Sequence, residues 1–139
     1  MRVKRALRRI RFWERQAMTT VHLPFPPSVN GLYANVPGKG RVKSQSYRIW
    51  ANAAGWSIKA QRPRPIPIGP YLITVMVQRK RDGRRRDLEN FIKAVSDLLV
   101  EHKIIPDDHH EERIEMQWSD AVTGCVVELV PLGQKERAA

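Results

Sequence analysis

A short stretch of opposite charges that leads into a helical pattern constrains this chain more than any other feature. Residues 84–90 read RRRDLEN, and from Leu88 to Leu99 the apolar residues recur at a spacing that places them on one side of an α-helix. Glu89, Asn90, Lys93 and Asp97 fall on the opposite side, which gives the helix a buried stripe and a polar face. The pattern predicts a helix from residue 87 to about residue 102, with Asp87 as its N-cap.

Helix stability does not explain the three arginines before this helix. A helix N-terminus carries a partial positive charge, which favours Asp87 and Glu89 but disfavours Arg84, Arg85 and Arg86. A polyanionic partner would explain the arginines, and a divalent cation held by the carboxylates would explain why both signs are crowded together. The stretch therefore favours metal-assisted hydrolysis of nucleic acid phosphate.

The distribution of charge supports a polyanionic partner. The 139 residues, most simply one domain, contain 25 Lys and Arg against 14 Asp and Glu, a formal net charge of +11. Of these, 17 basic residues but only one acid, Glu14, precede Asp82. Basic surface is thus expected from the first part of the chain and carboxylates from the second. A nuclease fits this layout, and so does a basic binding module with an acidic, solvated face.

Several classes of protein are disfavoured by what the sequence lacks. Cys125 is the single cysteine, so an intramolecular disulfide and a zinc cluster of cysteines are excluded, and a small buried thiol is expected. No apolar run reaches the length of a membrane span, and no signal-peptide core is visible. We expect a cytoplasmic protein that has neither a membrane nor a small-molecule substrate as its partner.

The pattern of the remaining segments predicts an α+β domain. We expect a mixed β-sheet with two main helices on one face, in the order β-α-β-α-β-β. Residues 35–41 are expected to form a mobile basic loop, in which Lys39 and Arg41, with Lys43 after them, contact phosphate. In the first helix, Ile49, Trp50 and Trp56 are expected among the packing side chains. The strands are predicted at residues 19–23, 71–78, 111–119 and 125–130, and the helices at residues 44–61 and 87–102.

The chain is expected to have three parts. Residues 19–132 form the folded domain, and residues 133–139 form a polar tail. Residues 1–18 form a basic N-terminal extension, which is either an amphipathic helix or a disordered segment.

Carboxylates also follow the organising helix, at Asp107 and Asp108. A helix of about 16 residues would separate them from its N-terminal carboxylates by about 24 Å. The loop must therefore turn back beside the sheet, or a second subunit must close the distance. Lys93 either contacts the scissile phosphate or stabilises the leaving oxygen, or it forms an ion pair with Glu89. His109 and His110, adjacent in a polar loop, are expected to be exposed.

Two segments resemble the RusA family of Holliday junction resolvases. DGRRRDLENFIKAVSDLL at residues 82–99, followed by IIPDD at residues 104–108, is similar to the family signature, in which D-L-D-N follows an arginine run. LPFPPSVNGLY at residues 23–33 is similar to the family's start, a short strand that runs into a Pro-Pro-Ser-Asn segment. Residues 1–17 lie outside the family pattern, as an added basic arm or a misassigned start.

The resemblance implies a homodimeric, Mg²⁺-dependent endonuclease that nicks four-way DNA junctions symmetrically in recombination and repair, often encoded by prophages, with Mn²⁺ as an alternative ion. One departure is that Glu89 stands where the family has aspartate. By motif position, the resemblance implies Asp87, Glu89 and Asp108 as metal ligands, with Asp107 as a neighbour that substitutes or assists, Lys93 as the catalytic lysine, and Arg84, Arg85 and Arg86 as contacts to DNA phosphate. Outside the motif, Asn30, Lys39, Arg41 and Lys43 are further candidate DNA contacts.

Two alternatives to the junction endonuclease stay open. A non-catalytic basic DNA-binding protein, a decayed or regulatory relative, would bind junctions in a salt-sensitive manner without Mg²⁺-dependent nicking. A basic RNA-binding or ribosome-associated protein would leave the carboxylates unexplained.

Overall fold

The computed structural model describes residues 18–133, except for the side chain of Asp108. All but the first residue of the predicted tail and all but the last residue of the predicted N-terminal extension lie outside this range. The strands are β1 (Thr19–Leu23), β2 (Tyr33–Val36), β3 (Gly40–Lys43), β4 (Tyr71–Gln78), β5 (Glu111–Ser119) and β6 (Cys125–Pro131). The α-helices are α3 (Gln45–Gln61) and α4 (Ile92–Glu101), and the 3₁₀ turns are η1 (Val29–Gly31), η2 (Leu88–Phe91) and η3 (Asp108–His110).

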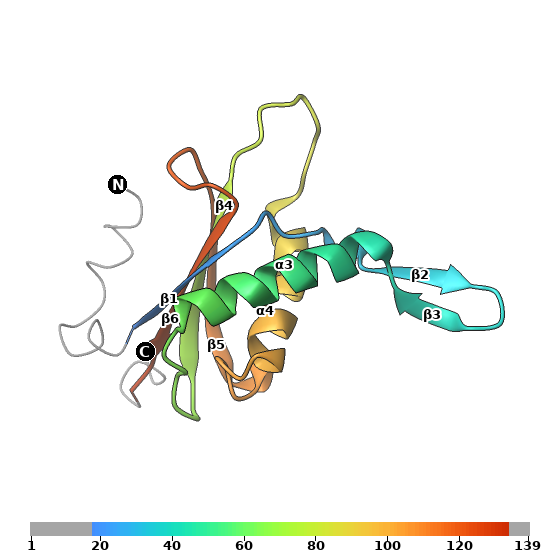
Figure 1. The fold of residues 1–139 in the computed structure, drawn as a ribbon. Helices are drawn as coiled ribbons and strands as arrows, with labels where there is room; N and C mark the ends of the chain where they lie inside the picture. Colours follow the sequence, from blue (N-terminus) through green and yellow to red (C-terminus); the bar gives the residue numbers. More distant parts are fainter. Residues whose placement is uncertain (1–17, 134–139) are drawn as a thin grey trace.

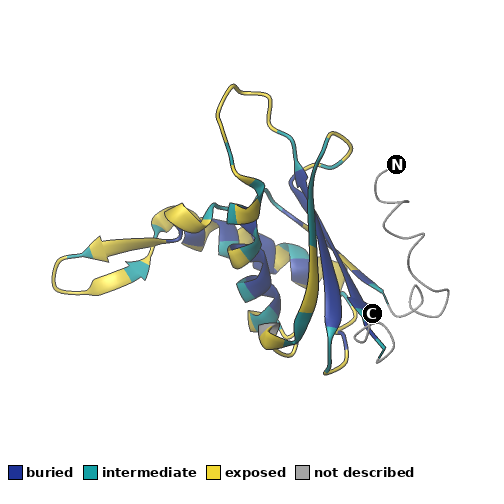
Figure 2. Ribbon diagram, turned by 180° about the vertical axis from the view of Figure 1, so that it is seen from behind, coloured by how far each residue is buried: buried dark blue, intermediate teal, exposed yellow. Residues whose placement is uncertain are grey.

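Four strands form one mixed sheet in the order β1-β6-β4-β5. Strand β4 pairs antiparallel with β6 and parallel with β5, and β1 pairs antiparallel with β6. Because parallel neighbours need a crossover connection, α4 carries the chain from β4 back to the start of β5. Both helices cover the same face of the sheet (Figure 2). The predicted α+β class, with a mixed sheet and two helices on one face, is confirmed.

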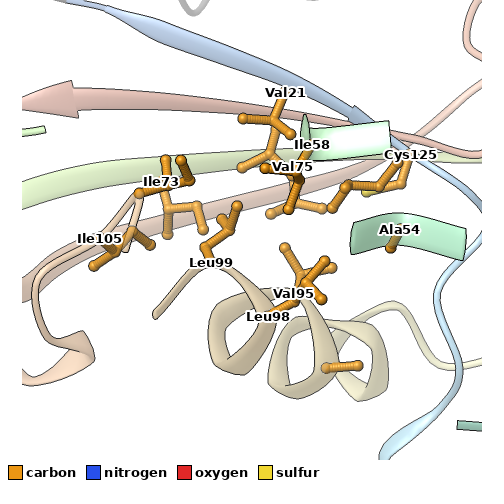
Figure 3. Close-up of a cluster of buried hydrophobic side chains, with 14 of the residues drawn as sticks. Val21, Ala54, Ile58, Ile73, Val75, Val95, Leu98, Leu99, Ile105 and Cys125 are labelled. Atoms are coloured by element: carbon orange, nitrogen blue, oxygen red, sulfur yellow. The ribbon is translucent and has the colours of Figure 1, made fainter. Parts of the chain in front are cut away.

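The core lies between this face and the two helices (Figure 3). Strand β4 is apolar and buried along nearly its whole length, as expected of the interior strand of the sheet. Cys125 lies within this core with no exposed surface, and burial raises the pKa of its thiol to about 12. The thiol is therefore protonated at neutral pH and acts as a small apolar side chain. The core residues that Figure 3 labels are Val21, Ala54, Ile58, Ile73, Val75, Val95, Leu98, Leu99, Ile105 and Cys125.

The prediction of a mobile loop at residues 35–41 is wrong. Strands β2 and β3 pair antiparallel in a hairpin that stands apart from the main sheet, so the element order gains two strands between β1 and α3. Gly38 and Gly40 both have a positive φ, near +79° and +73°, which allows the tight reversal at the tip. Lys39, Arg41 and Lys43 thus lie on a defined β-structure that projects from the body beside the start of α3 (Figure 1).

Helix α3 begins as its sequence predicts. The Ser44 hydroxyl accepts a hydrogen bond from the Tyr47 backbone N–H at 3.2 Å and so caps the helix. Trp50 is buried, but the expected packing of Ile49 and Trp56 is wrong, because these side chains are 63% and 65% exposed. They lie on the side of α3 that turns away from the core. Within residues 18–133, no helix combines the length and apolar character needed to cross a membrane.

Candidate active site

A cleft of about 610 Å³ lies where the arginine run meets the Pro-rich segment that follows β1. The Phe25–Ser28 segment and η1 form one wall, and the segment from Lys80 to Phe91 forms the other. The polar side chains that line the second wall are Lys80, Arg84, Arg85, Arg86, Asp87 and Asn90. The cleft thus contains the predicted residues Arg84 to Asp87 on one wall and the predicted DNA contact Asn30 on the other, whereas Phe25 had no predicted role.

A turn at Asp82 fixes the geometry of the arginine run. Arg86 donates two hydrogen bonds of 2.8 Å to the two carboxylate oxygens of Asp82, and the Arg84 backbone N–H donates a third at 3.1 Å. These hydrogen bonds, chiefly those from Arg86, hold the pKa of Asp82 well below its usual range. Arg86 is thereby committed to an internal partner. The side chains of Arg84 and Arg85 remain exposed beside the cleft and can contact phosphate.

Aromatic rings that the sequence analysis did not assign to the site support its cationic side chains. Phe25 packs edge-on against Phe91 at 5.4 Å between ring centroids, and Phe91 packs in the same way against Trp118 at 5.8 Å. The Lys80 ammonium and the Arg86 guanidinium lie 4.8 Å and 5.8 Å from the centroid of the Phe25 ring. The three rings come from segments distant in sequence, so local pattern carried no signal for them.

Asp87 and Glu89 present carboxylates without partners. Both residues are exposed, and within residues 18–133 neither carboxylate makes an ion pair or a hydrogen bond. The other aspartates with described side chains each pair with a basic side chain: Asp82 with Arg86, Asp97 with Lys93, Asp107 with His109, and Asp120 with Arg79 and Arg81. Asp87 stays unpaired although three arginines precede it directly, which leaves its oxygens open to another cation.

The expected capping by the Asp87 side chain is wrong. The chain enters the helix through the 3₁₀ turn η2, and the Asp87 side chain makes no capping hydrogen bond. Its backbone carbonyl instead accepts a hydrogen bond from the Asn90 N–H at 3.1 Å. Asp87 therefore starts the turn through its backbone alone, and its carboxylate makes no hydrogen bond to the helix.

The segment after α4 turns back beside the helix. The helix is 10 residues long, about 15 Å, and shorter than the sequence pattern suggested. The Ser96 hydroxyl, in the middle of α4, donates a hydrogen bond of 3.2 Å to the Glu111 carboxylate at the start of β5, and turn η3 contacts α4. The backbone of Asp108 therefore lies beside α4 rather than beyond its end.

Lys93 lies in the first turn of α4, and its side chain is exposed. It stands four residues after Glu89 and three before Ser96, so the three residues follow one stripe along the helix. Its ammonium pairs with Asp97 at 3.0 Å, so the predicted ion pair with Glu89 is not formed. Asp97 thus contributes to orienting the Lys93 side chain.

The described side chains do not by themselves form a metal cluster. Within the described part of the chain, from which the Asp108 side chain is excluded, no three His, Cys, Asp or Glu side chains lie close enough to share an ion. The Asp107 carboxylate is held by His109, through Nδ1 at 2.9 Å and the backbone N–H at 3.1 Å. His109 is exposed, as expected, whereas His110 is half-buried, and the two rings lie against each other.

Comparison with known proteins identifies the family. The family model described as endodeoxyribonuclease RusA matches residues 24–129, well over half of the chain. A comparison with curated proteins found no match. The matched region contains both walls of the cleft, the arginine run, the exposed carboxylates of η2 and the turn at η3. The chain therefore belongs to the RusA family of endodeoxyribonucleases, enzymes that act on junction DNA.

Proposed function

We propose that this protein is a Mg²⁺-dependent endonuclease that resolves four-way DNA junctions by symmetric phosphodiester hydrolysis in recombination and repair. The observation that carries the proposal is the pair of unpartnered carboxylates in η2 and at its start: Asp87, which lines the arginine-rich cleft, and Glu89, two residues further along the chain. In a chain with a net charge of +11, carboxylates that stay unpaired beside exposed arginines remain available to another cation.

The chemistry of the donor set fits a hard divalent cation. Mg²⁺ takes oxygen ligands and is commonly held by one or two carboxylates while it keeps several waters. In our proposal Asp87, Glu89 and Asp108 hold the ion, with Asp107 as a neighbour that assists. When bound, the ion supplies neutralisation of charge on the phosphate oxygens and activation of water. Mn²⁺ prefers the same oxygen ligands and is expected to substitute.

The basic side chains bind the DNA and assist departure of the leaving group. Arg84 and Arg85 bind phosphate at the cleft, and Arg86, locked onto Asp82, fixes the course of the run. Lys93 donates a proton or a hydrogen bond to the leaving oxygen, and Asp97 holds its ammonium in place. Asn30 on the opposite wall and Lys39, Arg41 and Lys43 on the hairpin extend the DNA contact beyond the scissile phosphate.

Symmetric resolution requires two incisions at equivalent positions on one junction. A single cleft of this kind cuts one strand at a time, so we propose that the working unit is a homodimer. A C₂ dimer, the commonest soluble assembly, would present two equivalent clefts to a junction that has two-fold symmetry.

The direct test is to incubate the purified protein with a synthetic four-way junction, with and without Mg²⁺. We expect paired nicks in strands of like polarity that appear only with the cation, and no comparable nicking of a linear duplex of the same sequence. Salt-sensitive junction binding without nicking in Mg²⁺ or Mn²⁺ would contradict the proposal and favour the non-catalytic DNA-binding alternative. Preferential binding of structured RNA in competition would favour the RNA-binding alternative.

A further inference from the structure

The β2–β3 hairpin has two chemically different faces. In its register Tyr33 lies opposite Lys43, and Asn35 lies opposite Arg41. Paired residues and residues two apart share a face of an antiparallel ribbon, so these four side chains lie on one face. The other face carries the small and apolar residues Ala34, Val36, Gly40 and Val42. We propose that the first face, together with η1, forms a pocket that binds an unpaired nucleobase at the branch point of the DNA.

The floor of this pocket is an aromatic ring backed by a cation. The Arg41 guanidinium lies 4.4 Å from the centroid of the Tyr33 ring, and Tyr33 is 36% exposed. Unpaired bases are recognised by stacking on aromatic rings and on guanidinium planes, which tolerate any base because every base has a π-face. A base entering from solvent would extend the Tyr33–Arg41 stack.

The remaining lining supplies hydrogen-bonding groups. A hollow of about 210 Å³ is bounded by Val29, Asn30, Tyr33, Asn35 and Arg41. This volume is below the roughly 300–1,000 Å³ of sites for drug-sized ligands, and it suits a fragment the size of one base. The amides of Asn30 and Asn35 each offer a donor and an acceptor, the groups needed to read a base edge.

Asn30 connects the pocket to the active-site cleft, because it lines both hollows. No acidic residue occurs from Met18 to Arg81, so nothing on the hairpin repels a DNA backbone that passes from the cleft to the pocket. A base captured there would lie close to the phosphate presented to Asp87, which would make cleavage depend on the base at the branch point. This inference rests on the proposed function, since it assigns a base-recognition site to the same enzyme.

Tyr33 also contacts the body of the protein, and the test must separate that role from stacking. Its ring packs edge-on against the ring of Tyr47 in α3 at 6.1 Å between centroids. Tyr33→Ala therefore removes both a stacking surface and a contact that holds the hairpin. Tyr33→Phe keeps both, and Asn35→Ala alters the pocket without touching Tyr47. Lys39→Ala at the hairpin tip, outside the pocket, is the control for general phosphate contact.

The experiment measures binding in EDTA, so that nicking does not interfere, to a four-way junction, a single-stranded oligonucleotide and a paired duplex. In the first two, 2-aminopurine replaces successive bases. For Tyr33→Ala we expect a loss of about 5- to 150-fold in affinity for junction and single strand, with little change on duplex. For wild type and Tyr33→Phe we expect an emission change at one branch-point position, absent in Tyr33→Ala. Asn35→Ala should change which base is preferred there, and Lys39→Ala should weaken binding to all three DNAs.

Two results would contradict the base-binding pocket while wild type still nicks junctions. One is that Tyr33→Ala loses equal affinity for duplex and junction. The other is that Asn35→Ala has the same base preference as wild type. Conversely, wild type could change the 2-aminopurine emission on single-stranded DNA and yet never nick junctions. This result would contradict the proposed function and would support the base-binding pocket.

Discussion

The Asp87→Asn variant is expected to nick four-way junctions about 10²- to 10³-fold more slowly than wild type, the scale seen when one preorganised electrostatic contact is removed from an active site. The carboxylate has no partner within the described residues, so its loss breaks no ion pair and leaves the fold intact. Binding of the junction should be equal or tighter, because a negative charge beside the DNA phosphates is removed. Single-turnover nicking rates and binding in EDTA, measured on the same preparation, test both halves of the prediction.

Asp120→Asn is the matched control. It makes the same chemical change at an exposed aspartate, but this carboxylate is paired with Arg81 at 3.0 Å and with Arg79 at 3.6 Å. We expect its nicking rate to stay within about three-fold of wild type, since exposed ion pairs contribute little. Equal rates in Asp87→Asn and wild type would remove Asp87 from the chemistry.

Gly124→Ala is expected to be the most destabilising single-methyl change in the turn between β5 and β6. Gly124 has φ near +70°, where a side chain costs about 1–2 kcal/mol. A Cβ there would also lie 2.4 Å from the Leu23 carbonyl oxygen, a contact that forces the backbone apart and adds about 1–3 kcal/mol. The sum, about 2–5 kcal/mol, should lower the thermal midpoint by roughly 10 °C in a domain of this size.

Gly124 bears on the site because its neighbours, Pro24 and Phe25, lead into one wall of the cleft. Gly38→Ala separates the cost of the positive φ from the cost of the steric contact. Gly38 has a similar φ of +79°, but no atom lies within 4 Å of an added Cβ. It should lower the free energy of unfolding by about 1 kcal/mol or less, because it lies at the tip of the projecting hairpin. Equal destabilisation by the two substitutions would show that the close approach to Leu23 does not constrain the fold.

Local sequence pattern was sufficient where one side of an element is buried and the other is not. The apolar spacing from Leu88 to Leu99 predicted α4, the apolar run of β4 predicted an interior strand, and Ser44 predicted the start of α3. The hairpin escaped prediction because β2 and β3 are exposed on both faces and only four residues long, so no hydrophobic period marks them. The glycines and proline of its tip resemble those of an ordinary loop.

The residues of the site could be predicted only where they are neighbours in the sequence. Arg84 to Arg86, Asp87 and Glu89 are neighbours in the chain, so their crowding is visible in the sequence. The cleft itself depends on tertiary contacts, with one wall at Phe25–Ser28 and the other more than 50 residues later. The return of the chain beside α4 depends on contacts such as that between Ser96 and Glu111, which no local period encodes. Helix propensity does not distinguish a helix that begins with a 3₁₀ turn from one that is α-helical from its first residue. The sequence therefore did not predict turn η2 or the absence of capping by the Asp87 side chain.

A crystal structure of the protein bound to a four-way junction, with Mn²⁺ in place of Mg²⁺, tests the central claim most directly, because the anomalous signal of the ion locates the site independently of any activity assay. We predict a peak coordinated by carboxylate oxygens of Asp87 and Glu89 from η2 and of Asp108 from η3, at about the 2.0–2.1 Å typical of Mg²⁺ or slightly longer. A peak held only by Asp107 and the histidines of η3, or a junction bound with no ion beside Asp87, would contradict it.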